Sequence, residues 1–141
     1  WYQTTLLSKG DEISLTQSNL YAVPSETLVP LINGTKQVII TEEEHKIPEN
    51  VINAVEKHKI TDVLFVSPSF LETVLTYVQL KRRQRSCTSL RSVTSSAETL
   101  PVQLARNFCK TFSHKGIQFW NARWCIGTTL GAPVDPEVVD T

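Results

Sequence analysis

From residue 37 onward, short β-branched runs alternate with longer stretches in which apolar residues recur every three or four positions. The compact apolar runs predict four strands, at residues 37–41, 61–66, 90–94 and 117–120. The amphipathic stretches between them predict helices that begin near Pro48, Ser67 and Pro101. Strands that alternate with helices in this way are typical of βαβ units. We therefore expect an α/β fold, with a mostly parallel sheet and helices on both of its faces.

Both ends of the chain carry weaker patterns. The apolar run at residues 28–32 closes with Asn33 and Gly34, which favours a short helix that ends at the glycine. Beyond Asn121 the apolar residues follow no clear period, so we expect residues 122–141 to be irregular.

The composition is that of an ordinary globular domain. The chain has 141 residues, of which 40% are hydrophobic and 20% are charged, enough for a single core. Its 14 basic and 14 acidic residues cancel, which argues against nucleic acid or an anionic membrane as a partner. One basic cluster stands out, at residues 81–85. We interpret it as a solvated loop, with a phosphate- or RNA-binding patch as the less favoured alternative because no aromatic residue interleaves it.

Cysteine and methionine usage gives two further expectations. The three cysteines are odd in number and widely spaced, and no metal-ligand spacing joins them to the histidines. Together with the lack of a signal peptide or an apolar run of ~18 residues, this favours a cytoplasmic location. The chain contains no methionine, which suggests a piece of a longer protein or an incomplete gene product.

The polar turn at residues 95–98 is the main candidate for chemistry. It follows the predicted strand at 90–94 and precedes the predicted helix at Pro101. In a parallel α/β sheet, this place is the carboxyl end of a strand beside a helix N-terminus, where nucleotides bind.

The order of motifs over about 120 residues resembles the adenylate-forming enzymes, which include acyl-CoA synthetases, luciferases and the adenylation domains of peptide synthetases. The first matching elements are Gly10-Asp11, the run from Ser25 to Thr35, and His58-Lys59-Ile60-Thr61. The later ones are Pro68-Ser69, and Leu90-Arg91 followed by Ser96-Ala97-Glu98-Thr99-Leu100-Pro101. The resemblance implies a parent enzyme that uses ATP and Mg²⁺ to convert a carboxylic acid to an acyl-adenylate. A thiol acceptor, either CoA or a phosphopantetheine carrier, would then capture the acyl group.

The resemblance also implies roles for particular residues. The nucleotide would lie against Ser95, Ser96, Ala97, Glu98 and Asn121. Tyr21 and Phe70 would belong to the acid pocket, although Phe70 also suits the core. Tyr21 occupies the place of the aspartate that pairs with an α-amine, which disfavours an α-amino acid substrate. Glu98 has a second interpretation, as a first-turn residue of the following helix capped by Ser95 or Ser96.

Departures from the family pattern limit what the chain is expected to do. The family follows its Asn with Tyr-Gly-x-Thr-Glu, whereas here the Tyr, Thr and Glu positions fall on Arg123, Ile126 and Gly127. The phosphate loop, the ribose-binding Asp and the Lys of the small domain have no counterpart in these residues. We therefore expect a truncated AMP-binding domain at residues 1–121, a divergent segment at 122–141, and no catalysis by the chain alone. The alternative is a non-catalytic Rossmann-like nucleotide-binding or interaction module.

Overall fold

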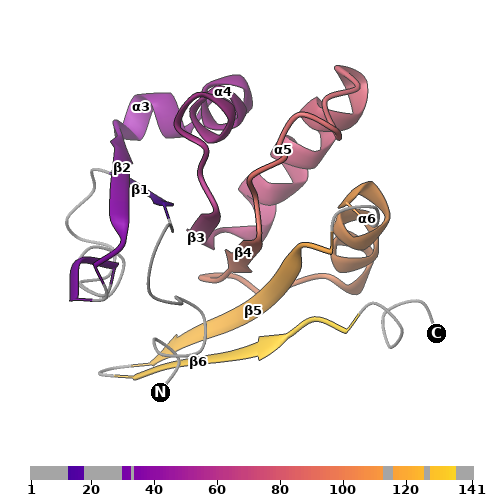
Figure 1. The fold of residues 1–141 in the computed structure, drawn as a ribbon. Helices are drawn as coiled ribbons and strands as arrows, with labels where there is room; N and C mark the ends of the chain where they lie inside the picture. The colour runs from indigo at the N-terminus through magenta and orange to yellow at the C-terminus, as the bar shows by residue number, and fades with distance from the viewer. Residues whose placement is uncertain (1–12, 18–29, 33, 113–115, 126–127, 136–141) are drawn as a thin grey trace.

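The computed structural model describes residues 13–17, 30–32, 34–112, 116–125 and 128–135, and its central feature is a six-stranded sheet (Figure 1). The strand order is β2-β1-β3-β4-β5-β6. Every neighbouring pair is parallel except β5 and β6, which are antiparallel. The predicted α/β class with a mostly parallel sheet is confirmed.

The elements follow the predicted alternation through the middle of the chain. The strands are β1 (Ile13–Gln17), β2 (Lys36–Ile40), β3 (Asp62–Val66), β4 (Ser92–Ser95), β5 (Gln118–Cys125) and β6 (Thr128–Pro133). The helices are α3 (Glu42–His45), α4 (Pro48–His58), α5 (Pro68–Leu80) and α6 (Val102–Phe112). Sequence analysis did not foresee β1, α3 or β6.

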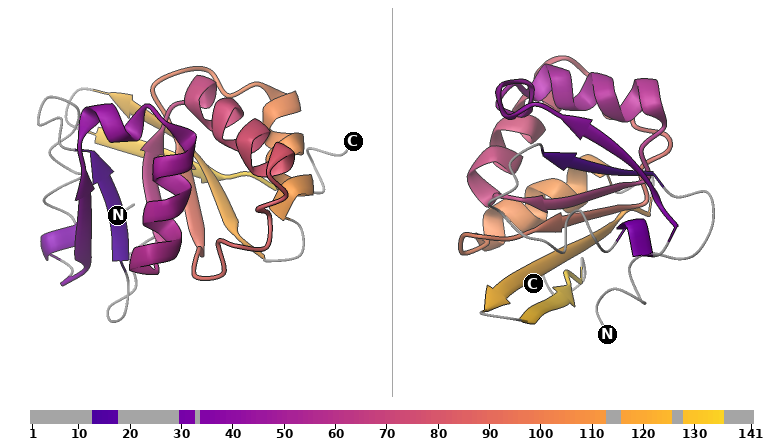
Figure 2. Two further views of the ribbon diagram at one scale, coloured as in Figure 1. Left: turned by 90° about the horizontal axis from the view of Figure 1, so that it is seen from above. Right: turned by 90° about the vertical axis from the view of Figure 1, so that its left-hand side faces the viewer.

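The three long helices α4, α5 and α6 lie on the same side of the sheet, whereas we expected helices on both faces (Figure 1; Figure 2, left). The strand order explains this arrangement, because the crossovers from β2 to β3, β3 to β4 and β4 to β5 all move in one direction. Right-handed crossovers that move in one direction place their helices on one face. The crossover from β1 to β2 runs the opposite way, and most of its residues lie outside the described ranges.

Local sequence signals set the helix ends. Pro48 and Pro68 stand at the first turns of α4 and α5, where a missing N–H costs nothing. Ser67 is the N-cap of α5, and its hydroxyl accepts a hydrogen bond from the Phe70 N–H. Near the N-terminus, residues 30–32 are helical, and Gly34 follows with a φ of 72°, as the glycine ending predicted.

The core lies between the helices and the sheet. The stripe predicted for α5 is buried there, and it consists of Leu71, Val74, Leu75 and Val78. From α6, Phe108 stacks on Phe119 of β5 with ring centroids 4.2 Å apart. Burial of this apolar surface is the main force that holds each helix on the sheet.

The segment after Asn121 differs from our expectation of irregular structure. Strand β5 continues to Cys125, and β6 pairs with it from Thr128 to Pro133. The reason is tertiary: β5 offers an open edge, and a segment that carries no hydrophobic period of its own can still complete that edge by backbone pairing. Within the described ranges, no helix is long and apolar enough to cross a bilayer.

Candidate functional site: a cleft at the carboxyl ends of β4 and β5

A cleft of about 540 Å³ opens where β4 ends beside β5. It is lined by the loop after β4 and by facing parts of β5 and β6, namely Ala97, Glu98, Thr99, Leu100, Asn121, Ala122, Arg123, Gly131 and Ala132. The register explains the position, because Ser95 pairs with Asn121 and the chain leaves the sheet just after Ser95. Such a crevice at strand carboxyl ends is the usual ligand site of an open α/β sheet.

The structure brings some of the predicted nucleotide residues together and separates others. Ala97, Glu98 and Asn121 all line the cleft. Ser95 and Ser96 are buried at the end of β4 and do not line it. The Ser96 N–H instead donates to the Val66 carbonyl at 3.0 Å, which fixes the start of the loop to β3. Tyr21 lies outside the described residues.

Glu98 is fixed by the neighbouring helix rather than by its own. One carboxylate oxygen accepts a hydrogen bond from the Ser69 hydroxyl at 2.8 Å, and the other accepts one from the Ser69 N–H at 3.1 Å. Ser69 lies in the first turn of α5, whose positive end favours a carboxylate. Helix α6 begins only at Val102, so the expected first-turn role of Glu98 in α6 was wrong. Its capping contact is with α5.

Ala97 adopts a conformation that usually requires glycine. Its φ is 76°, in the left-handed region, where an L side chain costs about 1–2 kcal/mol. The Glu98 contact and the Ser96 backbone bond hold the loop on either side of it. The small side chain of Ala97 takes up little of the cleft at this point.

Phe70 packs against a histidine and does not line the cleft. Its ring stacks on His45 of α3, with centroids 4.7 Å apart and an interplanar angle of 29°. Both residues border a small apolar cavity of about 40 Å³ within the core. Burial lowers the pKa of His45, because the cationic form loses hydration there. This surrounding fits the core interpretation of Phe70.

Arg123, Gly131 and Ala132 are cleft residues that sequence reasoning missed. Arg123 stands at the position where the family pattern has its adenine-stacking Tyr, and its side chain is exposed in the cleft. A guanidinium is planar, so it can stack on a ring as well as bind a phosphate. Gly131 and Ala132 enter the site because β6 pairs with β5 opposite Ala122 and Asn121. Their small size is the sequence signal that could have indicated a cleft at this position.

Three buried polar atoms near the strand ends have no hydrogen-bond partner among the described residues. They are the Thr94 and Ser95 hydroxyls and the Trp120 indole nitrogen. Buried polar groups are normally paired, so this region has spare hydrogen-bonding capacity.

The cleft residues do not fit the Mg²⁺ ion that the family resemblance implies. Glu98 is the sole carboxylate among the described cleft residues, and Ser69 engages both of its oxygens, so these residues do not form a Mg²⁺ site.

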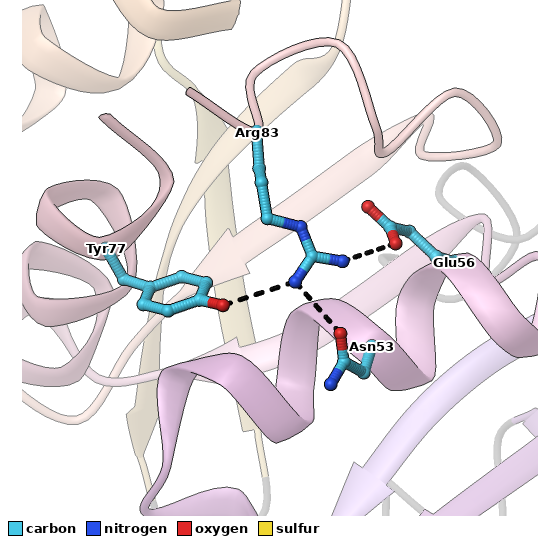
Figure 3. Close-up of polar contacts among 4 residues, drawn as sticks. All are labelled: Asn53, Glu56, Tyr77 and Arg83. Carbon is cyan, nitrogen blue, oxygen red and sulfur yellow. Dashed lines mark hydrogen bonds and ion pairs between the residues drawn. The ribbon is translucent and has the colours of Figure 1, made fainter. Parts of the chain in front are cut away.

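A second polar network ties the loop before β4 to the helices (Figure 3). Arg83 donates to Asn53 at 2.9 Å, to the Tyr77 hydroxyl at 3.2 Å, and to the Glu56 carboxylate. Burial acts to lower the pKa of Arg83, but its hydrogen bonds to Tyr77 and Glu56 outweigh burial and raise it. One arginine of the basic cluster is therefore a structural residue that joins α4 and α5.

An open, mostly parallel sheet with a cleft at the carboxyl ends of its strands is the architecture in which α/β domains usually bind ligands. The sequence profile of the AMP-binding enzyme family matches residues 3–138, and the chain therefore belongs to that family. The matched range extends well beyond Asn121 and includes β6. A search of curated proteins found no matching sequence.

Three solved structures share the fold of this chain. The nonribosomal peptide synthetase FmoA3, in its AMPPNP-bound form, is similar with a TM-score of 0.77 and 20% identity, over 93% of this chain and 14% of that one. CmiS6 gives a TM-score of 0.73 and 17% identity, over 90% and 30%. The luciferase-like enzyme from the nonluminescent mealworm Zophobas morio gives 0.72 and 13%, over 99% and 32%. At these identities the likeness establishes the fold, and the chain spans less than a third of each structure.

Proposed function

We propose that this chain forms the nucleotide-facing part of an ATP-dependent enzyme that activates carboxylic acids as acyl-adenylates. The observation that supports this most directly is the cleft that gathers Ala97, Glu98 and Asn121 in a chain of the AMP-binding family. Its volume of about 540 Å³ lies within the range of small-molecule sites. The nucleotide-bound form of FmoA3 is consistent with the proposal.

In this proposal the purine lies between the Ala97 loop and Arg123. The small side chain of Ala97 allows a flat ring to approach the loop closely, and the Arg123 guanidinium stacks on the ring or binds the α-phosphate. Asn121 supplies an amide donor and acceptor at the floor of the cleft. Glu98 acts through the loop, because its carboxylate is engaged by Ser69.

We propose further that these 141 residues do not form the adenylate by themselves. Phosphoryl chemistry depends on charges placed around the triphosphate. The described cleft residues supply one cation, Arg123, and no carboxylate that is free to hold a metal. The parent enzyme would add those groups, together with the acid pocket, for which Tyr21 and Phe70 remain predictions. Its partners would be a carboxylic acid and a thiol acceptor in the cytoplasm, where the Cys87 and Cys109 thiols fit a reducing environment.

Titration calorimetry of the 141-residue chain with AMP tests the proposed site. We expect binding that weakens about fivefold or more in Arg123→Ala, the loss expected when one charge-assisted or stacking contact is removed. Arg91→Ala is the matched control, because Arg91 is equally exposed but precedes β4, away from the cleft. No heat of binding at millimolar AMP, or an equal loss of affinity in the two variants, contradicts the proposed site.

The described cleft also favours a second candidate, a non-catalytic nucleotide-binding module. The specific observation is that Ser69 engages the one cleft carboxylate. Pyrophosphate exchange with a panel of carboxylic acids separates the two questions. AMP binding without exchange fits both the enzyme part and the module, and restoration of exchange by the missing segments of a parent enzyme identifies the enzyme. Exchange by the 141 residues alone would contradict their proposed inactivity.

A further inference from the structure

A second groove lies at the far ends of α5 and α6, away from the cleft. Its volume is about 1010 Å³, and it is bordered by Gln79, Arg82, Arg85, Asn107, Lys110 and Thr111. The cleft adjoins the first turn of α5, whereas this groove adjoins its last turn. Because α5 has 13 residues at about 1.5 Å each, the two sites are about 20 Å apart.

The charge of the groove is of one sign. Arg82, Arg85 and Lys110 border it, and no carboxylate is among its lining residues. The described residues provide no partner for the side chains of Arg82 or Arg85. Arg83, between them in sequence, points to Glu56 and Asn53 instead (Figure 3). The basic cluster is thus divided between one structural arginine and two arginines that face the groove.

The floor of the groove is held together by hydrogen bonds. The Gln79 side-chain amide donates to the Asn107 side chain at 2.7 Å and to the Thr111 hydroxyl at 2.8 Å. These bonds join the end of α5 to α6, so the cations on either side of the groove have a fixed base. Both Gln79 amide hydrogens are used in these bonds, and the Thr111 hydroxyl donates to the Asn107 carbonyl at 2.7 Å, so the donors for an anion come mainly from the cations that border the groove.

Arg82 occupies a backbone position that favours glycine. Its φ is 53°, and it follows Lys81, the C-cap of α5, so it stands where helices commonly end in a left-handed glycine. An arginine there is strained, and strain of this kind is concentrated at functional sites. The conformation also turns the chain at the helix end, where the Arg83 N–H donates back to the Val78 carbonyl at 2.9 Å.

We propose that this groove binds a small anion that carries two or more phosphate groups. Arginine forks and ammonium groups match phosphate oxygens, and several cations around one groove suit a compact, multiply charged ligand. The lining has no aromatic residue on which bases could stack, which disfavours single-stranded nucleic acid. It also has no large apolar residue to anchor a peptide.

The test is titration calorimetry of the 141-residue chain with inorganic tripolyphosphate at low ionic strength. We expect binding by the wild type that weakens about tenfold or more in the double variant Arg82→Gly, Arg85→Gln, since each lost cation removes a charge-assisted contact. Arg82→Gly also relieves backbone strain, so the fold is kept. Lys59→Gly is the matched control: Lys59 is an exposed cation with a φ of 54° at the end of α4, outside the groove. It should leave affinity within twofold.

Other outcomes overturn the proposal. No binding by the wild type, or an equal loss in Lys59→Gly, removes the site. A loss in Arg123→Ala instead of the double variant assigns the anion to the cleft. Tighter binding of a single-stranded RNA or of polyglutamate than of tripolyphosphate assigns the groove to a different class of partner.

Discussion

Two polar loops flank β4, and each is attached to a helix through one charged side chain. Before β4, Arg83 joins α4 and α5 through three side chains. After β4, Glu98 binds the first turn of α5 through the hydroxyl and N–H of Ser69. The loops differ in composition, since residues 81–91 contain five cations whereas residues 96–101 contain a single charged residue, Glu98. In each loop one charged side chain serves the fold, and the ligand contacts are proposed for its neighbours.

The two attachments differ in surroundings, and this predicts a difference in strength. The Arg83 and Glu56 side chains are 22% and 28% exposed, so breaking their pair leaves a partly buried charge. The hydrogen bonds of Glu98 are exposed to water and are made to one helix end. The first contact should therefore matter for global stability, and the second mainly for the local shape of the cleft.

The largest effect is expected for Arg83→Ala. It leaves the Glu56 carboxylate partly buried without its cation, and we expect a loss of about 1–3 kcal/mol in the free energy of unfolding. Urea denaturation measures it, with Arg82→Ala as the control from the same cluster. Equal midpoints for the two variants would end the distinction drawn between these arginines.

A smaller loss, of about 1 kcal/mol, is expected for Glu98→Ala, which removes a capping contact from α5. Glu72→Ala is the control, because Glu72 is an exposed carboxylate on the same helix and no hydrogen bond to its carboxylate is present among the described residues. Hydrogen exchange of the Ser69 amide should become faster only in the Glu98 variant. Unchanged exchange of the Ser69 amide would show that Glu98 does not hold the first turn of α5.

Ala97→Gly should stabilise the fold by about 0.5–1 kcal/mol, because glycine adopts a φ of 76° without steric cost. The matched substitution Ala54→Gly, within α4, should do the opposite and cost about 1 kcal/mol. Thermal unfolding of both variants checks the pair. Two losses of equal size would show that the loop after β4 is not strained.

The smallest effect concerns pH and the packing at the start of α5. Burial lowers the pKa of His45, so the folded state binds fewer protons than the unfolded chain below the unfolded value of about 6.5. Stability is therefore full above that pH and should fall as the pH drops to 5. Glu42 and Glu44 have lowered pKa values and lose their contribution only below about 4.5. In His45→Gln, the midpoint of urea denaturation should change less between pH 7 and pH 5 than in the wild type. An equal pH dependence of the midpoint in the two proteins would contradict this account.

The middle of the fold could be predicted because its signals are local. The β-branched runs and the helix stripe from Leu71 to Val78 report burial directly, and Pro48, Pro68 and Ser67 mark the helix starts. The position of the cleft followed from the strand–turn–helix order around residues 95–101. Ala97, Glu98 and Asn121 do lie together in the cleft, whereas their role in nucleotide binding stays a prediction.

What the sequence could not show depends on partners that are distant along the chain. Glu98 binds Ser69, 29 residues away, and no spacing rule links them. Strand β6 forms because β5 lies beside it, so Gly131 and Ala132 joined the site without a pattern of their own. The roles of Arg82 and Arg83 differ through backbone direction, which a cluster of four cations within five residues does not reveal.

The place of β1 has a consequence for how the domain can be divided. Although β1 comes first of the described strands, it is inserted between β2 and β3 and hydrogen-bonds to both. Sheet assembly must therefore wait until residues about 50 positions apart have met, which slows folding relative to a sheet built in chain order. An exon boundary or engineered cut just after Gln17 would therefore remove the strand that joins β2 to the other four, and not a strand at the edge of the sheet.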